Sequence, residues 1–148
     1  MTHYLINHNC IYNEDSHEIK NTENAFTIKM TAMRARCLSF IIENAPNGII
    51  EKEQLTTALW GSRGKYVSDA NLTQLLYLIR KDLKTLGINS LFITIPRQGI
   101  KVNKQIPISP IEEKKNSFLL GRWRLVLIGM LTTSLLALGA VAEFIHIN

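Results

Sequence analysis

The first 29 residues alternate between short apolar runs and polar turn segments. The runs read HYLI, CIY, HEIK and AFTI, and segments rich in Asn, Asp and Glu, such as 13–16 and 21–24, separate them. Runs of this length between turn residues are typical of short strands. The pattern therefore predicts three or four antiparallel strands in this part of the chain.

The spacing of apolar residues then becomes helical. Thr31 is a suitable N-cap, and a strongly apolar helix is expected to follow it to about Asn44, where the Pro-Asn-Gly turn at 46–48 ends it. After a short extended piece, a second helix is expected from about Glu51 to Leu59, with acidic residues in its first turn. The inward side chains of this second helix are expected to be Leu55, Leu59 and Trp60.

A third helix is expected from Ser68, as its N-cap, to about Leu86, where Gly87 closes it. The segment before it, 61–67, contains two glycines and two cations and is expected to be a loop. The helix has an apolar stripe at the spacing of an inward-facing side. The stripe consists of Leu72, Leu76, Ile79, Leu83 and Leu86.

Two β-rich runs, 91–95 and 100–102, follow the third helix on either side of the turn sequence PRQG. They predict a hairpin with a cation at its tip. The folded domain is then expected to cover residues 1–103. Residues 104–122 contain two prolines and the charged run EEKKNS, a composition that favours a linker.

The segment Leu125–Ala142 has 18 consecutive uncharged residues. A helix of this length spans roughly 27 Å, close to the hydrocarbon thickness of a bilayer. We therefore expect a transmembrane helix over 123–143 and a short tail over 144–148. Lys and Arg residues precede the span and none follows it, so the positive-inside rule predicts a single-pass protein of the bacterial inner membrane with a cytoplasmic N-terminal domain.

Small residues recur every fourth position within this span, at Gly129, Thr133 and Ala137. They would line one side of the helix, where a second helix could approach closely. A homodimer or a membrane partner protein is the corresponding hypothesis, and ordinary membrane-helix composition is the alternative.

The formal net charge is +5, but the basic residues are unevenly distributed. Residues 1–60 carry five basic and seven acidic side chains, whereas residues 61–104 carry eight basic and two acidic ones. The basic excess is therefore confined to the predicted third helix and hairpin. Such a patch attracts polyanions, although a solvated lysine-rich surface has the same composition.

Candidate catalytic chemistry is absent from the sequence pattern. Two cysteines, Cys10 and Cys37, cannot form a disulfide framework, and the four histidines are scattered singly, without the spacing of a metal site. We expect reduced thiols, no metal and no cofactor. There is also no Ser/His/Asp set, no paired carboxylates and no phosphate-binding glycine loop, so an enzyme is disfavoured.

Four sequence features occur in the order of a winged helix-turn-helix. They are LW-G at 59–61, VSDANLTQ at 67–74, IRKDL at 79–83 and ITIPRQGIKV at 93–102. With these motifs, residues 3–103 resemble the DNA-binding domain of OmpR/PhoB-type regulators, and in particular the membrane-anchored ToxR/CadC-like branch. The resemblance implies an α+β winged helix-turn-helix with N-terminal antiparallel strands, three helices and a C-terminal hairpin wing.

The resemblance also implies that the third helix, about 68–86, enters the major groove of double-stranded DNA and that the wing, about 91–102, lies on the adjacent minor groove or backbone. The residue types agree, because a helix in the groove needs polar groups opposite its core stripe and cations for phosphates. Base-reading candidates are Asn71 and Gln74, supported by Thr73 and Tyr77. The candidates for phosphate contact are Arg80, Lys81, Lys84, Arg97 and Lys101, and Arg97 could also enter the minor groove. Helix-start polarity for Asn71 and Thr73, and a structural role for Arg80, are the alternatives.

Three positions depart from the family pattern or bear on other partners. Leu75 and Leu78 stand where relatives more often have small or polar residues, which suggests an apolar patch on the DNA-facing side. Ile100 stands where the family commonly has Tyr. The segment 61–67 corresponds to a region that can touch RNA polymerase in such activators.

Two functions follow as hypotheses. The first is a membrane-anchored, sequence-specific DNA-binding transcriptional regulator. The second is a membrane-tethered protein-interaction module in which a drifted winged helix pairs with another regulator through Leu75, Tyr77 and Leu78. We expect no receiver domain before the first strand and no sensor domain after the span. Control is then expected to be independent of a phosphorelay and to act through abundance, the membrane helix or a partner.

Overall fold

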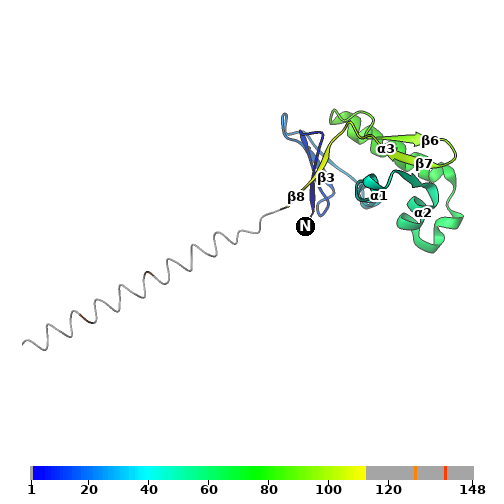
Figure 1. Cartoon of the computed structure of the whole chain (residues 1–148), viewed down its shortest axis with the longest axis horizontal. Helices are drawn as coiled ribbons and strands as arrows, with labels where there is room; N and C mark the ends of the chain where they lie inside the picture. Colours follow the sequence, from blue (N-terminus) through cyan, green and yellow to red (C-terminus); the bar gives the residue numbers. More distant parts are fainter. Residues whose placement is uncertain (1, 113–128, 130–138, 140–148) are drawn as a thin grey trace, which may run out of the picture. The chain divides into compact units, whose positions relative to one another are not determined.

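A computed structural model describes residues 2–112 together with 129 and 139 (Figure 1). Within 2–112 the chain forms one α+β unit of short strands and three α-helices. Four strands come first, as the polar and apolar pattern predicts. They are β1 (His3–Ile6), β2 (Cys10–Asn13), β3 (Glu18–Asn21) and β4 (Thr27–Lys29).

The N-terminal sheet has five strands in the order β4-β3-β2-β1-β8, all antiparallel. Its last strand, β8 (Ile108–Ile111), returns from the far end of the domain to pair with β1. This strand lies inside the range that the sequence assigned to a linker, so the folded unit continues beyond residue 103. Pro110 made a strand unexpected from the sequence, because proline disfavours strands. It is tolerated here because β8 is at the edge of the sheet.

Tyr12 joins this sheet to the first helix, α1 (Ala32–Asn44). Its ring is fully buried, and its hydroxyl donates to the carbonyl oxygen of Ala35 at 2.9 Å and shares a hydrogen bond with Ser39. Burial raises the pKa of Tyr12 to about 12. The neutral phenol is therefore a fixed polar link across an otherwise apolar contact.

The predicted helices are confirmed, with small shifts at their ends. Thr31 caps α1, and Ser68 caps α3 (Asp69–Thr85) by accepting the N–H of Asn71. Between them lie the single-turn helix η1 (Ala45–Asn47), the strand β5 (Ile49–Glu51) and α2 (Lys52–Trp60). Glu51 and Gln54 form a reciprocal capping box at the start of α2.

The segment before α3 was expected to be a loop, but residues Gly61–Tyr66 form the 3₁₀ helix η2, packed on α2. Gly64 makes this packing possible. A Cβ atom at position 64 would lie 2.8 Å from the backbone oxygen of Thr56. Gly64 therefore provides close approach, whereas Gly61 has open space around it and a φ of +61°.

The second sheet has the order β5-β7-β6 and contains the predicted hairpin. Strands β6 (Phe92–Ile95) and β7 (Gly99–Val102) pair in antiparallel register, with Ile95 opposite Gly99. Residues 96–98 form the tip between them. The hairpin with its tip is called the wing below.

The core lies between the three helices and the two sheets. The predicted stripe of α3 is buried throughout, and Leu55 and Leu59 of α2 are buried as expected, with Trp60 partly buried against them. Both cysteines are buried and free, and burial raises the pKa of the Cys37 thiol to about 12. Ile100 is also a core residue, at 1% exposure.

Within the described residues, no helix has the length and apolar character needed to cross a bilayer. The membrane span expected over 123–143, and the tail after it, lie outside the described residues except for Gly129 and Gly139.

Candidate nucleic-acid interface

One side of α3 is exposed and carries mainly polar, aromatic and cationic side chains, with Ala70 among them. The opposite side is the buried leucine and isoleucine stripe. The helix therefore presents hydrogen-bonding groups near its N-terminal end and positive charge near its C-terminal end. The exposed candidates on this side are Asn71, Thr73, Gln74, Tyr77, Lys81 and Lys84.

The expected apolar patch on this side is not present as such. Leu75 is 9% exposed and belongs to the core, and Leu78 is partly buried. At 100° per residue, Leu75 lies beside Leu72 and Leu76, which widens the buried stripe rather than extending the exposed side. The prediction that Leu75 faces DNA or a protein partner was wrong.

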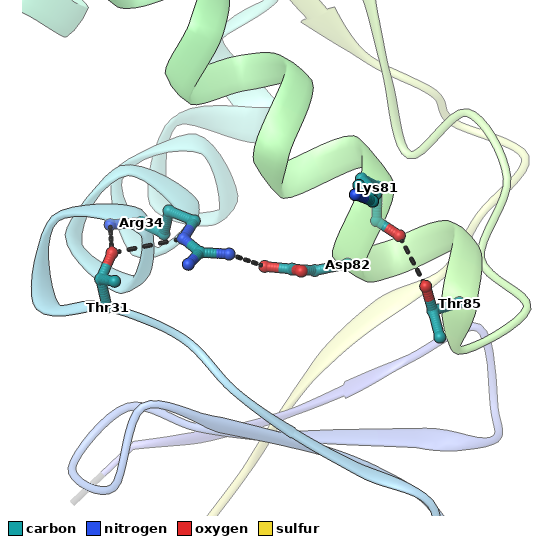
Figure 2. Close-up of polar contacts among 5 residues, drawn as sticks. All are labelled: Thr31, Arg34, Lys81, Asp82 and Thr85. Atoms are coloured by element: carbon teal, nitrogen blue, oxygen red, sulfur yellow. Dashed lines mark hydrogen bonds and ion pairs between the residues drawn. The ribbon is translucent and has the colours of Figure 1, made fainter.

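An ion pair holds α3 to α1 (Figure 2). The Nη1 atom of Arg34 lies 2.7 Å from a carboxylate oxygen of Asp82, and both side chains are about four-fifths shielded from water. The Thr31 hydroxyl oxygen accepts a further bond from the Nε–H of Arg34. Because Thr31 also caps α1, the guanidinium is oriented from both sides, and the rotation of α3 relative to α1 is restricted.

The N-terminal sheet also holds the C-terminal end of α3. The backbone oxygen of Leu86, directly after the helix, accepts a bond from Nδ2 of Asn21 at 3.1 Å and faces the Cys10 thiol at 3.8 Å. Asn21 is 6% exposed, and its amide oxygen accepts the N–H groups of Glu23 and Asn24 in the turn after β3. One side chain thus shapes a turn and caps the helix end.

Replacement of Asn21 by Ala should lower the free energy of unfolding by about 1–3 kcal/mol, because it leaves three buried or partly buried backbone groups without their partner. Chemical denaturation of the full chain measures this change. Lys20→Ala, on the same strand but exposed, is the matched control and should change stability by less than about 0.5 kcal/mol. An equal effect of the two substitutions would contradict the assigned role of Asn21.

Arg80 is the third attachment of α3, and it contacts the wing. Its Nη2 atom donates to the hydroxyl oxygen of Thr94 on β6 at 2.7 Å. Its guanidinium carbon lies 4.5 Å from the centre of the Phe92 ring. Burial lowers the pKa of Arg80 from its ordinary value. The side chain predicted to contact phosphate is therefore engaged within the protein, unlike the exposed Lys81 and Lys84.

The tip of the wing carries Arg97 in an unusual backbone conformation. The N–H of Gln98 donates to the oxygen of Ile95 at 3.1 Å, and Arg97 between them has φ +65°. Pro96 before a residue with positive φ is the arrangement of a type II turn. Arg97 is exposed at the tip, whereas Lys101 is partly buried between Ile49 and Ile93 on neighbouring strands.

A groove of about 770 Å³ lies where the wing tip, the start of α2, η2 and the start of α3 meet. Its lining carries charges of both signs, and Lys52 pairs with Asp69 there at 3.7 Å. Arg97 and Lys65 also line it. No group of three or more potential metal ligands occurs in the part of the chain that the structure describes.

A helix-turn-helix with a hairpin wing on one side and an N-terminal antiparallel sheet on the other defines the winged-helix class. Two solved structures share this fold. The DNA-binding domain of Escherichia coli CadC has a TM-score of 0.61 and 17% identity, and the match covers 74% of this chain and 96% of that domain. The DNA-binding domain of the response regulator AdeR, solved with an intercistronic region, has a TM-score of 0.54 and 20% identity over 65% and 95% of the two chains. The expected winged-helix fold is thus confirmed.

No family model matches the chain. A curated relative, the uncharacterized protein YqeI of Escherichia coli K12, is 28% identical over 109 residues, which are 72% of this chain and 40% of the relative. The chain therefore spans less than half the length of that relative.

Proposed function

We propose that this protein is a sequence-specific DNA-binding transcriptional regulator. In this proposal α3 enters the major groove and the wing lies on the adjacent minor groove or backbone. One observation carries it: the exposed side of α3 has polar side chains in its N-terminal half and two lysines, Lys81 and Lys84, in its C-terminal half, and the wing beside it ends in an exposed arginine. The solved DNA-binding domains with the same fold support it.

The exposed residues divide by their chemistry. Asn71 and Gln74 are carboxamides on the N-terminal half of α3 and can pair bidentately with adenine. Thr73 and Tyr77 lie beside them and would add contacts to base edges or sugars. Lys81 and Lys84 are placed for phosphates, as are Arg97 and Lys101 in the wing. Arg80 is instead held within the protein by the Thr94 hydroxyl and the Phe92 ring.

The proposal extends to the location of the protein. The apolar run Leu125–Ala142 would anchor it in the bacterial inner membrane with the winged helix in the cytoplasm, and the small residues in that run would allow pairing with a second copy or a membrane partner. The surface around η2 is a candidate contact for RNA polymerase, because Tyr66 is 88% exposed there. In the alternative function, a protein-interaction module, Leu75 does not contribute to the contact surface because it is buried.

The test is selection of binding sites from a randomised duplex library by the full chain in mild detergent, followed by dimethyl-sulfate and hydroxyl-radical footprinting on the enriched duplex. Enrichment of one sequence, with protection of adjacent major- and minor-groove positions, is the expected result. Binding that is equal for selected and unselected duplexes would overturn sequence-specific recognition. A membrane-fractionation experiment on cells that express the full chain tests the anchor separately.

The substitution Lys81→Gln should weaken DNA binding uniformly across sequences and reduce the slope of log K against log salt by about 0.9, because one phosphate contact is lost. Fluorescence anisotropy over a salt series measures the slope. Lys20→Gln removes the same charge from an exposed position of the N-terminal sheet, outside the proposed interface, and should leave the slope unchanged. A slope that does not respond to Lys81→Gln would remove this residue from the interface.

A further inference from the structure

We propose that Arg80 is a positioning residue that fixes the wing against α3, so that helix and wing meet DNA in one set geometry. This inference rests on the proposed DNA-binding function. The contact that carries it joins the two elements directly, since the Nη2 atom of Arg80 on α3 donates to the Thr94 hydroxyl on β6 at 2.7 Å. The two residues are 14 positions apart and lie on opposite sides of the connection between helix and wing.

The guanidinium of Arg80 is oriented by a second, independent contact. Its central carbon lies 4.5 Å from the centre of the Phe92 ring, within the range of a cation–π interaction. Phe92 is 1% exposed and pairs with Val102 in the wing sheet, so the ring is a fixed platform. A planar group can rest on a ring and donate in its own plane at the same time, which a lysine ammonium cannot reproduce.

The Arg80–Thr94 contact is important for the position of β6, because β6 lies at the edge of its sheet. In the order β5-β7-β6, β6 is an edge strand that is hydrogen-bonded to β7 alone. Thr94 and Phe92 are on the side of β6 that faces the helices, because their register partners Ile100 and Val102 are core residues. Arg80 therefore ties the outer strand of the wing to α3. This contact is about three turns along the helix from Asp69, which lines the same groove as Arg97 of the wing tip.

Arg80 differs from the neighbouring cations of α3 in its exposure and in its contacts. The side chains of Lys81 and Lys84 are exposed and form no hydrogen bond or ion pair with another described residue. Arg80 is instead partly buried and contacts both the Phe92 ring and the Thr94 hydroxyl. A cation that served mainly as a phosphate contact would be free to extend toward DNA. The observed geometry preorganises the wing for binding, because a wing that is already held in place loses less conformational freedom when it binds DNA.

A double-mutant cycle on the selected duplex tests this inference. Arg80→Lys keeps the charge, and Thr94→Val keeps the shape of the side chain. Each should weaken binding by about fivefold to tenfold, and the double substitution should weaken it no further than either alone. Thr94→Ser restores the hydroxyl and should bind as the unchanged chain does. Footprints of Arg80→Lys and Thr94→Val should lose protection at the wing positions and keep it at the α3 positions.

Lys81→Gln is the matched control, because it should weaken binding with the wing footprint intact. Near-normal affinity of Arg80→Lys together with no effect of Thr94→Val would show a simple phosphate contact and overturn the inference. Additive losses in the double substitution would overturn it as well. If the unchanged chain selects no duplex at all, the proposed function fails first, and the two failures are thus distinguished. Thermal unfolding of each variant shows whether it is folded.

Discussion

Replacement of Gly99 by Ala should destabilise the domain by about 3 kcal/mol, which corresponds to a fall in Tm of about 12 °C. Gly99 begins β7, opposite Glu51 of β5 and Ile95 of β6. A Cβ atom at this position would overlap the backbone oxygen of Ile50 and lie 2.9 Å from its carbonyl carbon. Neither atom belongs to a flexible side chain, so the strands must separate to accommodate the methyl group.

The control for this substitution is Gly48→Ala, at the other end of β5. Gly48 has φ +83° and ψ −125° and no atom within 4 Å of a built Cβ, so only backbone strain of about 1–2 kcal/mol is expected there. Thermal unfolding of both variants measures the difference. Equal losses would mean that the close approach between β5 and β7 does not determine the position of the wing. Because the wing carries Arg97, Gly99→Ala should also reduce DNA affinity.

Much of this fold can be predicted from the sequence because its signals are local. The caps Thr31 and Ser68, the turn after α1 and the stripe of α3 each depend on residues within a few positions of one another, and all are confirmed. The hairpin is equally local, since Pro96 and Gly99 flank its tip. These elements suffice to bring the predicted DNA-contacting residues of α3, other than Arg80, to one exposed side.

The features that the sequence did not reveal depend on distant partners. β8 is a strand only because β1 is available to pair with it, and its own four residues contain a proline. Asn21 reads as an ordinary turn residue, although it is buried and reaches a carbonyl 65 positions away. Leu75 was assigned to the exposed side from a family pattern, whereas it is a member of the core cluster, together with residues far from it in the sequence.

These distant contacts share one consequence for the candidate site. The helix α3 is attached to α1 through Asp82, to the N-terminal sheet through the backbone of Leu86, and to the wing through Arg80. Three attachments to three separate elements leave one side of the helix for a ligand. That side is the polar one, and its rigidity favours a geometry-dependent contact such as base-edge recognition in a groove.

Replacement of Arg97 by Gly should change stability and DNA affinity in opposite directions. Arg97 has φ +65° at the wing tip, a conformation that costs a non-glycine residue roughly 1 kcal/mol. Glycine removes this strain, so the free energy of unfolding should rise by about 0.5–1 kcal/mol. The cation is lost at the same time, and affinity for the selected duplex should fall about tenfold. Strain retained at an exposed tip is expected where the side chain has a binding role.

Two further variants separate the strain from the charge. Arg97→Ala loses the cation but keeps a positive φ for a residue with a Cβ, so it should match Arg97→Gly in affinity and not in stability. Gln98→Ala, at the neighbouring exposed position, should bind DNA as the unchanged chain does. If Arg97 enters a narrow minor groove, its loss should cost more affinity on duplexes with an A-tract at the wing position than on G·C-rich ones. An Arg97→Gly variant that binds normally would remove the wing tip from the interface.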